Sequence, residues 1–389
     1  MGYQIVAYEK TQIIPHRDIE LNVERQPIDL FVTTPDGGLK EDTGLIFLIN
    51  EFGSFPDATD CIDSTHPALA NQYNCMVASV SYFGIYRNKQ MDISDAFIRN
   101  LNRIYNLKFT TDTFADAKDY FDAFRIIAKA IAERGVTSVD LRCQPLMITG
   151  RNEYQSWGLL PAIDCLTAVG EILKKYPRID TKRLYAFGQY YGGYIASLMG
   201  KFAPNTFATV INKSGYSRVE TRHILCGETL EEDITISFKL EGKNYDFTIA
   251  ACANNPWTII DETSPNYFSD AHRAIRSLIT EKQFIDSETK YILFSEKEDD
   301  SYVRFMEKQV EAMKKTNNVV YEKIDSYRDQ SIIKMTAFFR YVYEHYMDEF
   351  KRDLPSTDFS LNRTNSFDCG DKKYEFKFDE DYNLQVRII

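Results

Sequence analysis

The chain has 389 residues, of which 44% are hydrophobic and 26% charged, a composition typical of globular proteins. Glycine and proline are sparse, at 18 and 12 residues, which excludes collagen and wholesale disorder. The 57 acidic residues outnumber the 46 lysines and arginines, and the resulting net charge of -11 repels nucleic-acid phosphates and anionic lipid head groups. We therefore expect neither nucleic acid nor a membrane surface as a partner.

Signals for export and for metal binding are missing from the sequence. No stretch approaches the roughly 20 apolar residues that span a bilayer, and residues 1–10 lack the basic start and apolar core of a secretory signal. This pattern predicts a cytoplasmic chain. The seven cysteines occur singly and the five histidines are isolated, so we expect reduced thiols, no metal and no cofactor.

The N-terminal region contains three patterns typical of strands. Residues 19–32 alternate apolar and polar side chains around a turn near Pro27, which predicts a hairpin with one solvated face. Residues 44–50 and 75–80 are short, continuous apolar runs. Such runs are typical of central strands that are covered on both faces.

Helix and strand patterns alternate through the middle of the chain. Residues 113–135 repeat apolar side chains every three or four positions and end at Gly135, which predicts an amphipathic helix with a glycine stop. This alternation predicts a mostly parallel central sheet with helices on both faces, the α/β class. The patterns that follow are a strand at 146–149, a helix at 154–175, a strand at 183–187, a helix at 194–202 and a strand at 207–212.

The alternation stops between about residues 217 and 289. Two alternating runs at 233–240 and 245–250 predict a hairpin, and Ser264-Pro265 has the sequence of a helix start. We interpret this segment as a cap inserted into the α/β domain, which then resumes. The prediction is an α/β domain over residues 1–353 with a cap at about 217–289, and a C-terminal β-hairpin tail at 354–389. The resumed elements are a strand at 291–294, a helix at 302–315, a strand at 319–324 and a helix at 332–350.

A glycine-rich turn, GQYYGGY at residues 188–194, lies between a predicted strand and a predicted helix. Gly188 and Gly192 stand two residues either side of Tyr190. This is the spacing of a nucleophile elbow, a sharp, strained turn that lifts its central side chain above the sheet. The simpler alternative is a sharp turn whose glycines serve packing alone.

At this turn the chain resembles the α/β-hydrolase superfamily, and within it the prolyl-oligopeptidase-like branch, whose elbow reads G-x-S-Y-G-G-Y. It is similar, more closely, to a bacterial family of hydrolase-like proteins of unknown function found in flagellin and surface-glycan loci. The resemblance covers about residues 18–350 and implies an α/β-hydrolase-like fold. The supporting strings are VASVSYFGI at 77–85, EYQSWGL at 153–159, AID at 162–164 and KFAP at 201–204.

The sequence departs from the superfamily's chemistry at three places. That chemistry needs an elbow serine, a histidine oriented by a carboxylate, and backbone NH groups that hold the oxyanion. Tyr190 replaces the serine, and the loop at 325–331, where the histidine is expected, holds none. Glu51 places a carboxylate where the oxyanion would form, unless it turns outward to solvent. Only the acid position is met, by Glu298 or Asp299.

Three departures at one site predict a hydrolase-like protein with a degenerate triad. The resemblance implies a non-catalytic binding or accessory protein linked to surface-glycan or flagellin modification. The alternative is an esterase or acyltransferase that acts on a surface glycan with a non-standard site. A purely structural partner in an assembly is a third class, so a protein partner remains open.

We expect a pocket beneath the cap that takes a small sugar or acyl ligand. Several carboxylates in one cleft would repel one another, so at least one should have a raised pKa and an anionic ligand would be disfavoured unless a cation accompanied it. The degenerate catalytic positions are Tyr190, Glu298 and Asp299, and the expected pocket residues are Glu51, Tyr191, Gly188 and Gly192.

Overall fold

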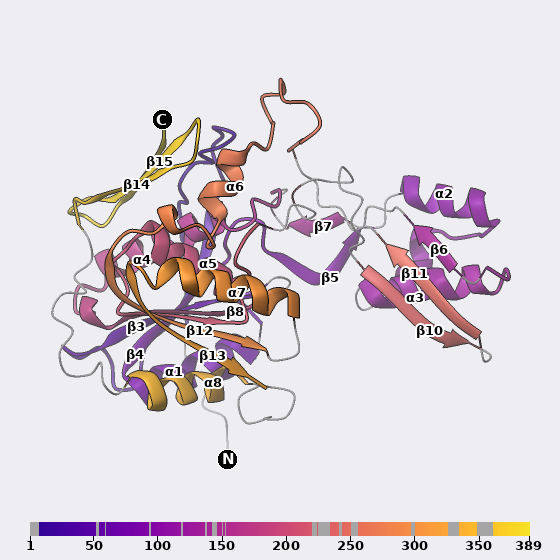
Figure 1. Ribbon diagram of the computed structural model, residues 1–389. Helices are drawn as coiled ribbons and strands as arrows, with labels where there is room; N and C mark the ends of the chain where they lie inside the picture. Colours follow the sequence, from indigo (N-terminus) through magenta and orange to yellow (C-terminus); the bar gives the residue numbers. More distant parts are fainter. Residues whose placement is uncertain are drawn as a thin grey trace, which may run out of the picture. The chain divides into compact units, whose positions relative to one another are not determined.

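A computed structural model shows two compact units (Figure 1). Unit 1 comprises Met1–Tyr82, Gly158–Val219 and Asp270–Ile389, and unit 2 comprises Phe83–Trp157 and Glu220–Ser269. Most of the segment expected as a cap therefore belongs to unit 2, together with Phe83–Trp157, while the chain from Asp270 onward belongs to unit 1. The structure describes residues 8–51, 54–58, 60–92, 95–117, 120–136, 138–141, 146–149, 151, 153–219, 224, 234–240, 243–249, 256–296, 300–325, 334–347 and 361–389.

Unit 1 is built on an eight-stranded sheet with the order β1-β2-β4-β3-β8-β9-β12-β13 (Figure 1). Strand β2 pairs antiparallel with both β1 and β4, and all later neighbours pair in parallel. The predicted mostly parallel sheet is confirmed. The strands are β1 (Glu9–Ile13), β2 (Ile28–Thr33), β3 (Gly44–Ile49), β4 (Cys75–Val80), β8 (Leu184–Gln189), β9 (Thr209–Lys213), β12 (Ser287–Glu296) and β13 (Asn317–Ile324).

The hairpin predicted over residues 19–32 is wrong. Strand β2 begins at Ile28. The preceding segment that pairs with it in antiparallel orientation is β1, not residues 19–25. The segment after Asp18 forms turns instead, because the Asp18 carboxylate accepts hydrogen bonds from the backbone NH groups of Glu20 and Leu21. An aspartate that bonds to the backbone two or three residues later offers that backbone an alternative to a strand.

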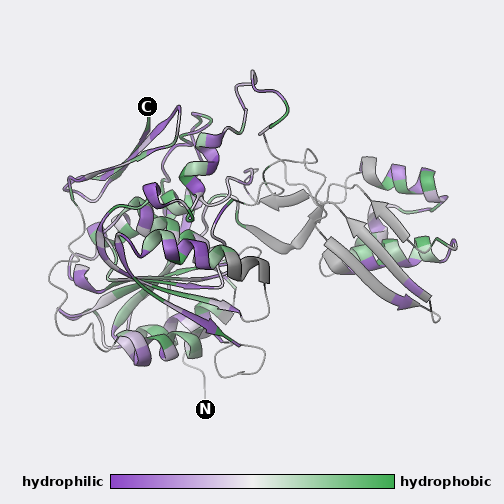
Figure 2. Cartoon of the chain, in the orientation of Figure 1, coloured by the Kyte–Doolittle hydropathy of each residue, from purple (hydrophilic) through white to green (hydrophobic). Residues whose placement is uncertain are grey.

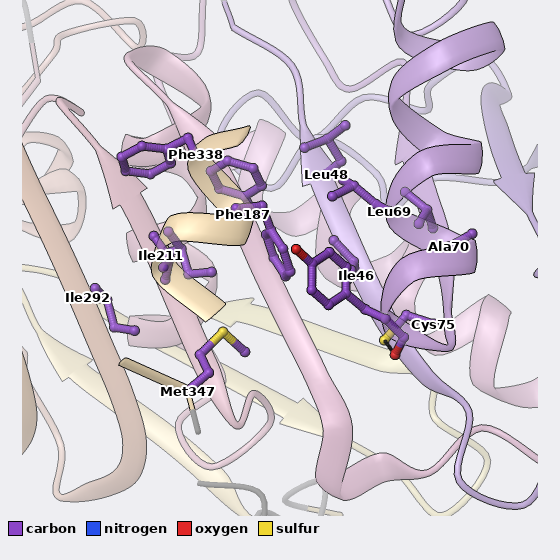
Figure 3. Close-up of a cluster of buried hydrophobic side chains, with 14 of the residues drawn as sticks. Ile46, Leu48, Leu69, Ala70, Cys75, Phe187, Ile211, Ile292, Phe338 and Met347 are labelled. Carbon is purple, nitrogen blue, oxygen red and sulfur yellow. Dashed lines mark hydrogen bonds between the residues drawn. The ribbon is translucent and has the colours of Figure 1, made fainter. Parts of the chain in front are cut away.

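Two helices, α1 (His66–Tyr73) and α8 (Met335–Val342), cover one face of the sheet and enclose an apolar core. Side chains from the central strands, including Ile46, Phe187 and Ile211, pack against α1 and α8 (Figure 3). Phe187 stacks on Phe338 with ring centroids 6.0 Å apart. Figure 2 shows that the central strands are predominantly hydrophobic, as expected for strands covered on both faces. The α-helices of unit 1 are α1 (His66–Tyr73), α4 (Leu159–Lys175), α5 (Tyr191–Phe202), α6 (Asp270–Arg276), α7 (Asp300–Met313) and α8 (Met335–Val342).

Several helix boundaries differ from the sequence-based prediction. Helix α4 begins at Leu159 rather than near residue 154, because Trp157 and Gly158 have φ values of 45° and 93°, which are not helical. Within the predicted helix at 332–350, the described residues form α8 followed by a π-helical turn. The single-turn elements of unit 1 are η1 (Asp60–Thr65), η3 (Thr181–Arg183), η5 (Glu281–Gln283) and η7 (Tyr343–Met347).

A separate three-stranded antiparallel sheet forms the C-terminal part of unit 1 (Figure 1). The predicted hairpin is present, and β14 adds a third strand. Phe376 stacks on Phe202 of α5, with ring centroids 4.3 Å apart and the rings nearly parallel. Gly170 of α4 permits a close approach, because a Cβ atom there would lie 2.3 Å from the Tyr382 carbonyl oxygen. The strands are β14 (Thr364–Asp368), β15 (Lys373–Phe378) and β16 (Leu384–Ile388).

Two buried ion pairs hold the segment before β2 against the helices of unit 1. Arg25 makes two hydrogen bonds to the Asp164 carboxylate on α4, at 2.7 and 2.6 Å. Arg276 on α6 makes two to Glu20, at 2.9 and 2.5 Å. All four side chains are almost fully buried, so each charge depends on its partner.

Unit 2 contains the predicted hairpin and a helical layer. Strands β10 and β11 pair antiparallel, and β6 pairs in parallel with β11. The predicted amphipathic helix is α3, and Gly135 beyond its end has a φ of 80°, as expected of a glycine stop. The elements are β5 (Tyr86–Asp92), α2 (Asp95–Tyr105), η2 (Thr111–Phe114), α3 (Tyr120–Ala132), β6 (Ser138–Leu141), β7 (Leu146–Thr149), β10 (Ile234–Leu240) and β11 (Lys243–Ile249).

Candidate functional site

Tyr190 occupies a strained turn at the carboxyl end of β8, a central parallel strand of unit 1. Its φ and ψ are 47° and -118°, and 45% of the residue's surface is exposed. A Cβ atom on Gly188 would lie 2.2 Å from the Gly192 carbonyl carbon, and one on Gly192 would lie 2.3 Å from the Ile49 carbonyl oxygen. Both glycines are therefore required by close backbone approach, and the predicted elbow geometry is confirmed.

A second strained residue, Ser214, follows the adjacent strand β9. Its φ is 55°, and its backbone NH donates to the Phe294 carbonyl oxygen at 2.8 Å. The Tyr190 NH donates to the Lys213 carbonyl oxygen, also at 2.8 Å, which joins the two strand ends. Sparsely populated backbone conformations of non-glycine residues cost about 1–3 kcal/mol each and cluster at functional sites. The two adjacent strand ends thus mark a candidate site.

Four strands place charged and polar side chains at this same edge of the sheet. Glu51 follows β3 and hydrogen-bonds through its side chain with Gln189 at the end of β8. Lys213 ends β9 and interacts electrostatically with Glu51 and with Glu296, which ends β12. Both Lys213 and Glu296 are buried. In open α/β sheets, ligands bind outside the carboxyl ends of the strands, so this cluster lies where a ligand is expected.

Burial shifts the pKa values of two members of this cluster in the direction that favours their uncharged forms. It raises the pKa of Glu51, against the opposing effects of the Gln189 hydrogen bond and the Lys213 charge. It lowers the pKa of Lys213, although the charges of Glu296 and Glu51 oppose that shift. A raised carboxyl pKa was expected from repulsion between neighbouring carboxylates. The pKa of Glu51 is raised, but the main cause of the shift is desolvation. The half-buried side chain also argues against a Glu51 turned outward to solvent.

Two buried polar atoms beside the cluster have no hydrogen-bond partner within the described part of the chain. They are the Asn50 side-chain oxygen and the Ser214 hydroxyl. The Asn50 amide nitrogen donates to the Cys61 sulfur at 3.7 Å, so one end of that side chain is held. Burial raises the pKa of Cys61 to about 11, which keeps this thiol protonated and a poor nucleophile. Buried polar atoms normally find a partner, which here points to a polar ligand or water.

Tyr191, an expected pocket residue, lies in the interior of unit 1. Only 1% of its surface is exposed, and its hydroxyl accepts the Gly158 backbone NH at 2.9 Å. Its ring contacts those of Tyr82 and Tyr194, each with centroids 6.2 Å away. These contacts give Tyr191 a packing role beneath the turn.

The expected acid and base of a triad are only partly described. Glu298 and Asp299 lie outside the described residues, as do His223 and residues 326–331 of the expected histidine loop. His66 is buried, with Nε2 2.8 Å from the Ser79 hydroxyl, and burial lowers its pKa to about 4. Burial also lowers the pKa of His272, to about 3.

The remaining described histidines are bonded to backbone atoms. His345 Nδ1 lies 2.8 Å from the Tyr341 carbonyl oxygen, and His16 Nδ1 lies 2.9 Å from that of Arg17. No described group of three or more histidine, cysteine, aspartate or glutamate side chains could hold a metal ion. None of the described helices has the length and apolarity needed to cross a membrane.

Lys213 and Glu296 are the charged members of the cluster that sequence reasoning missed. A signal for Lys213 exists, since this residue directly follows the apolar run FATVIN at the carboxyl end of a central strand. A lysine at the end of a buried strand contributes a charge to the functional edge of a parallel sheet. The carboxylate partners of Lys213 come from β12 and from the segment after β3. No local sequence pattern connects these segments with Lys213.

Comparisons with known proteins give a family but no described function. The model of a family described as a protein of unknown function (DUF2920) matches residues 9–388. A comparison with curated proteins found no match.

Several solved structures are similar to this chain. Acylaminoacyl peptidase from Pyrococcus horikoshii is 13% identical with a TM-score of 0.42, and the match covers 87% of this chain and 41% of the peptidase. Dipeptidyl peptidase 4 from Porphyromonas gingivalis is 13% identical with a TM-score of 0.43, covering 87% and 34%. An arylesterase is 12% identical with a TM-score of 0.41, covering 86% and 84%. The chain spans about two fifths of the length of the first peptidase. The fold of this chain is established by its own strand order and by the turn at Tyr190.

Proposed function

The chain belongs to the DUF2920 family of proteins of unknown function, and from its site we propose that it is a hydrolase-like protein that binds a small ligand without forming an acyl-enzyme. In this proposal the triad is degenerate, and the protein acts as a binding or accessory protein. Its link to surface-glycan or flagellin modification is supported by the sequence resemblance alone.

The observation that carries the proposal is the side chain on the elbow. The turn at Tyr190 keeps the strain and the close glycine packing of a nucleophile elbow, but it presents a phenol where acyl transfer needs a serine. Phenols ionise near pH 10 and are bulkier than a hydroxymethyl group, so attack on a carbonyl is disfavoured. A strained turn retained without the nucleophile supports a binding role.

The polar cluster beside the turn supports a ligand with both hydroxyl and carbonyl groups. Lys213 supplies a donor, Glu51 supplies an acceptor, and the unpartnered Asn50 oxygen supplies a second acceptor. The positive charge of Lys213 partly compensates the carboxylates around it, which the sequence alone did not foresee. A neutral sugar or an acylated sugar fits this mixed set best.

A second candidate function is supported by the pKa shifts. An acid with a raised pKa beside an amine with a lowered pKa is the arrangement of a general acid–base pair. Glu51 and Lys213 have these shifts. The alternative is therefore an esterase or acyltransferase that uses Lys213 as its base on a glycan ester.

Covalent labelling separates the two functions. We expect the purified protein neither to hydrolyse small activated esters above background nor to react with a fluorophosphonate probe. Tyr190→Ser alone should remain inactive, because the serine would still lack its usual histidine base. Labelling of a residue at this edge of the sheet, mapped by mass spectrometry and lost in Lys213→Met, would favour the enzyme.

Ligand binding is tested by thermal stability against a panel of neutral glycans and acyl donors. A ligand that binds only the folded protein raises the melting temperature by mass action. We expect a neutral glycan to raise it in the wild type and to do so less in Glu51→Gln and Lys213→Met. The exposed Glu311→Gln is the matched control and should respond as the wild type does. A panel that shifts none of the proteins would contradict the binding function.

A further inference from the structure

The C-terminal sheet has a second face, opposite the one that packs on α5. This face carries a hollow of about 160 Å³ lined by five polar side chains, Thr364, Glu375, Lys377, Gln385 and Arg387. A cavity of roughly 150 Å³ accepts benzene, so the hollow has room for one six-membered ring.

Strand register places these five side chains together. Lys377 of β15 pairs with Thr364 of β14 and with Gln385 of β16, and Glu375 pairs with Arg387. Residues two apart on a strand point to the same face, so the lining residues form one continuous polar surface. The alternate residues of β15, such as Phe376, are buried against the body of unit 1.

The hollow carries an excess of positive charge. The Glu375 carboxylate is already paired with Lys373 at 3.2 Å and accepts the Ser366 hydroxyl at 3.3 Å. Within the described part of the chain, neither Lys377 nor Arg387 forms an ion pair. Lys377, Arg387 and Glu375 therefore give the lining of this ring-sized hollow a net charge of +1, on a protein whose net charge is -11.

We propose that this hollow binds a small polyhydroxylated carboxylate, of the hexuronate class. The ligand carboxylate binds between Lys377 and Arg387, since a guanidinium matches a carboxylate with two parallel hydrogen bonds. The ligand hydroxyl groups bind to the Thr364 hydroxyl, the Gln385 amide and the Glu375 carboxylate. This site is separate from the elbow cluster and does not depend on the function proposed for it.

The charge balance selects a carboxylate over other ligands of similar size. A neutral sugar leaves both cations without a partner. A carboxylate monoanion neutralises the net charge of +1 that Lys377, Arg387 and Glu375 give the hollow, whereas a phosphate dianion exceeds that charge. A monoanion with several hydroxyl groups satisfies all five side chains at once.

The test measures binding of glucuronate by titration calorimetry at low ionic strength, where surface charges are least screened. We expect the wild type to bind glucuronate and the double variant Lys377→Met/Arg387→Met to bind it at least about tenfold more weakly. Arg178→Met/Lys314→Met removes the same charge from exposed positions elsewhere and should bind as the wild type does. Glu51→Gln should also bind normally, which separates this site from the elbow cluster.

Three results would overturn the proposal. They are no measurable glucuronate binding by the wild type, equal binding by the double variant, and equal binding of glucose, which lacks the carboxylate. Tighter binding of glucose 6-phosphate than of glucuronate would overturn the assignment to a carboxylate. The melting temperature of the double variant verifies its fold, since both side chains lie on the solvent face of the sheet.

Discussion

Gly188 and Gly192 let the turn at Tyr190 close, because the backbone on either side of it is nearly in contact. Gly188→Ala would place a methyl group against the Gly192 backbone, which can move only if α5 shifts. We expect the substitution to lower the free energy of unfolding by about 3 kcal/mol, measured by urea titration. Gly37→Ala is the control, since its nearest neighbour is the flexible end of Lys40 at 3.8 Å, and it should change stability by under about 0.5 kcal/mol.

Glu51 should make the stability of the protein depend on pH. Burial raises its pKa, so the folded protein holds this proton more tightly than the unfolded chain does. The resulting stabilisation is present at acidic pH and is lost as the pH rises through the folded pKa. Glu51→Gln should therefore raise the melting temperature relative to the wild type at neutral pH, with the difference vanishing toward about pH 4.

The control for this pH series is Glu311→Gln, which removes a charge from an exposed position on α7. Its melting temperature should differ from that of the wild type by the same amount across the series. A Glu51→Gln protein that is less stable than the wild type at neutral pH would show that the ionised carboxylate stabilises the fold through Lys213.

At the scale of elements, the Arg25–Asp164 pair fastens the segment before β2 to α4. Arg25→Met leaves the Asp164 carboxylate buried without its partner, so we expect a loss of about 3–5 kcal/mol in the free energy of unfolding. The double variant Arg25→Met/Asp164→Leu should lose less than either single variant, because no charge is left buried. For comparison, Glu171→Ala breaks a more exposed pair with Lys174 on the same helix and should cost under about 1 kcal/mol. Additive losses in the double variant would contradict this account.

Elements with strong local signals could be predicted from the sequence. Strand β8, the turn and α5 were predicted because an apolar run, spaced glycines and a helical period follow one another within 20 residues. Strand β1 was missed because only Ile13, one residue of its five, is buried, so it has no apolar pattern. Strand β14 was missed for a related reason, since one of its two buried residues is the polar Asn365.

The candidate site was predictable only where a single segment determines it. The position and strain of Tyr190 follow from the turn sequence, and Glu51 follows directly from the strand before it. Lys213 and Glu296 belong to the site because β9 and β12 are neighbours in the sheet, a relation that appears only after folding. The sequence-based prediction therefore counted carboxylates alone and did not include the positive charge of Lys213.

At the scale of the whole molecule, the C-terminal sheet completes the core of unit 1. Phe376→Ala would leave a cavity against Phe202, and we expect it to cost about 3–5 kcal/mol in the free energy of unfolding. Lys377→Ala, one residue away on the solvent face, should cost under about 0.5 kcal/mol. If the two variants unfold at the same denaturant concentration, the sheet is an appendage that contributes no stability to unit 1.

The dependence of α5 on this sheet also affects the order of events during synthesis. Asn365 of β14 lies 163 residues after Phe202, whose carbonyl oxygen accepts its amide hydrogen. At translation rates of about 5–20 residues per second, the apolar end of α5 leaves the ribosome roughly 8–30 s before the strands that cover it. Throughout that interval the nascent chain exposes a surface of the kind that chaperones bind. A ribosome-bound chain that stops before β14 should therefore remain sensitive to protease at α5.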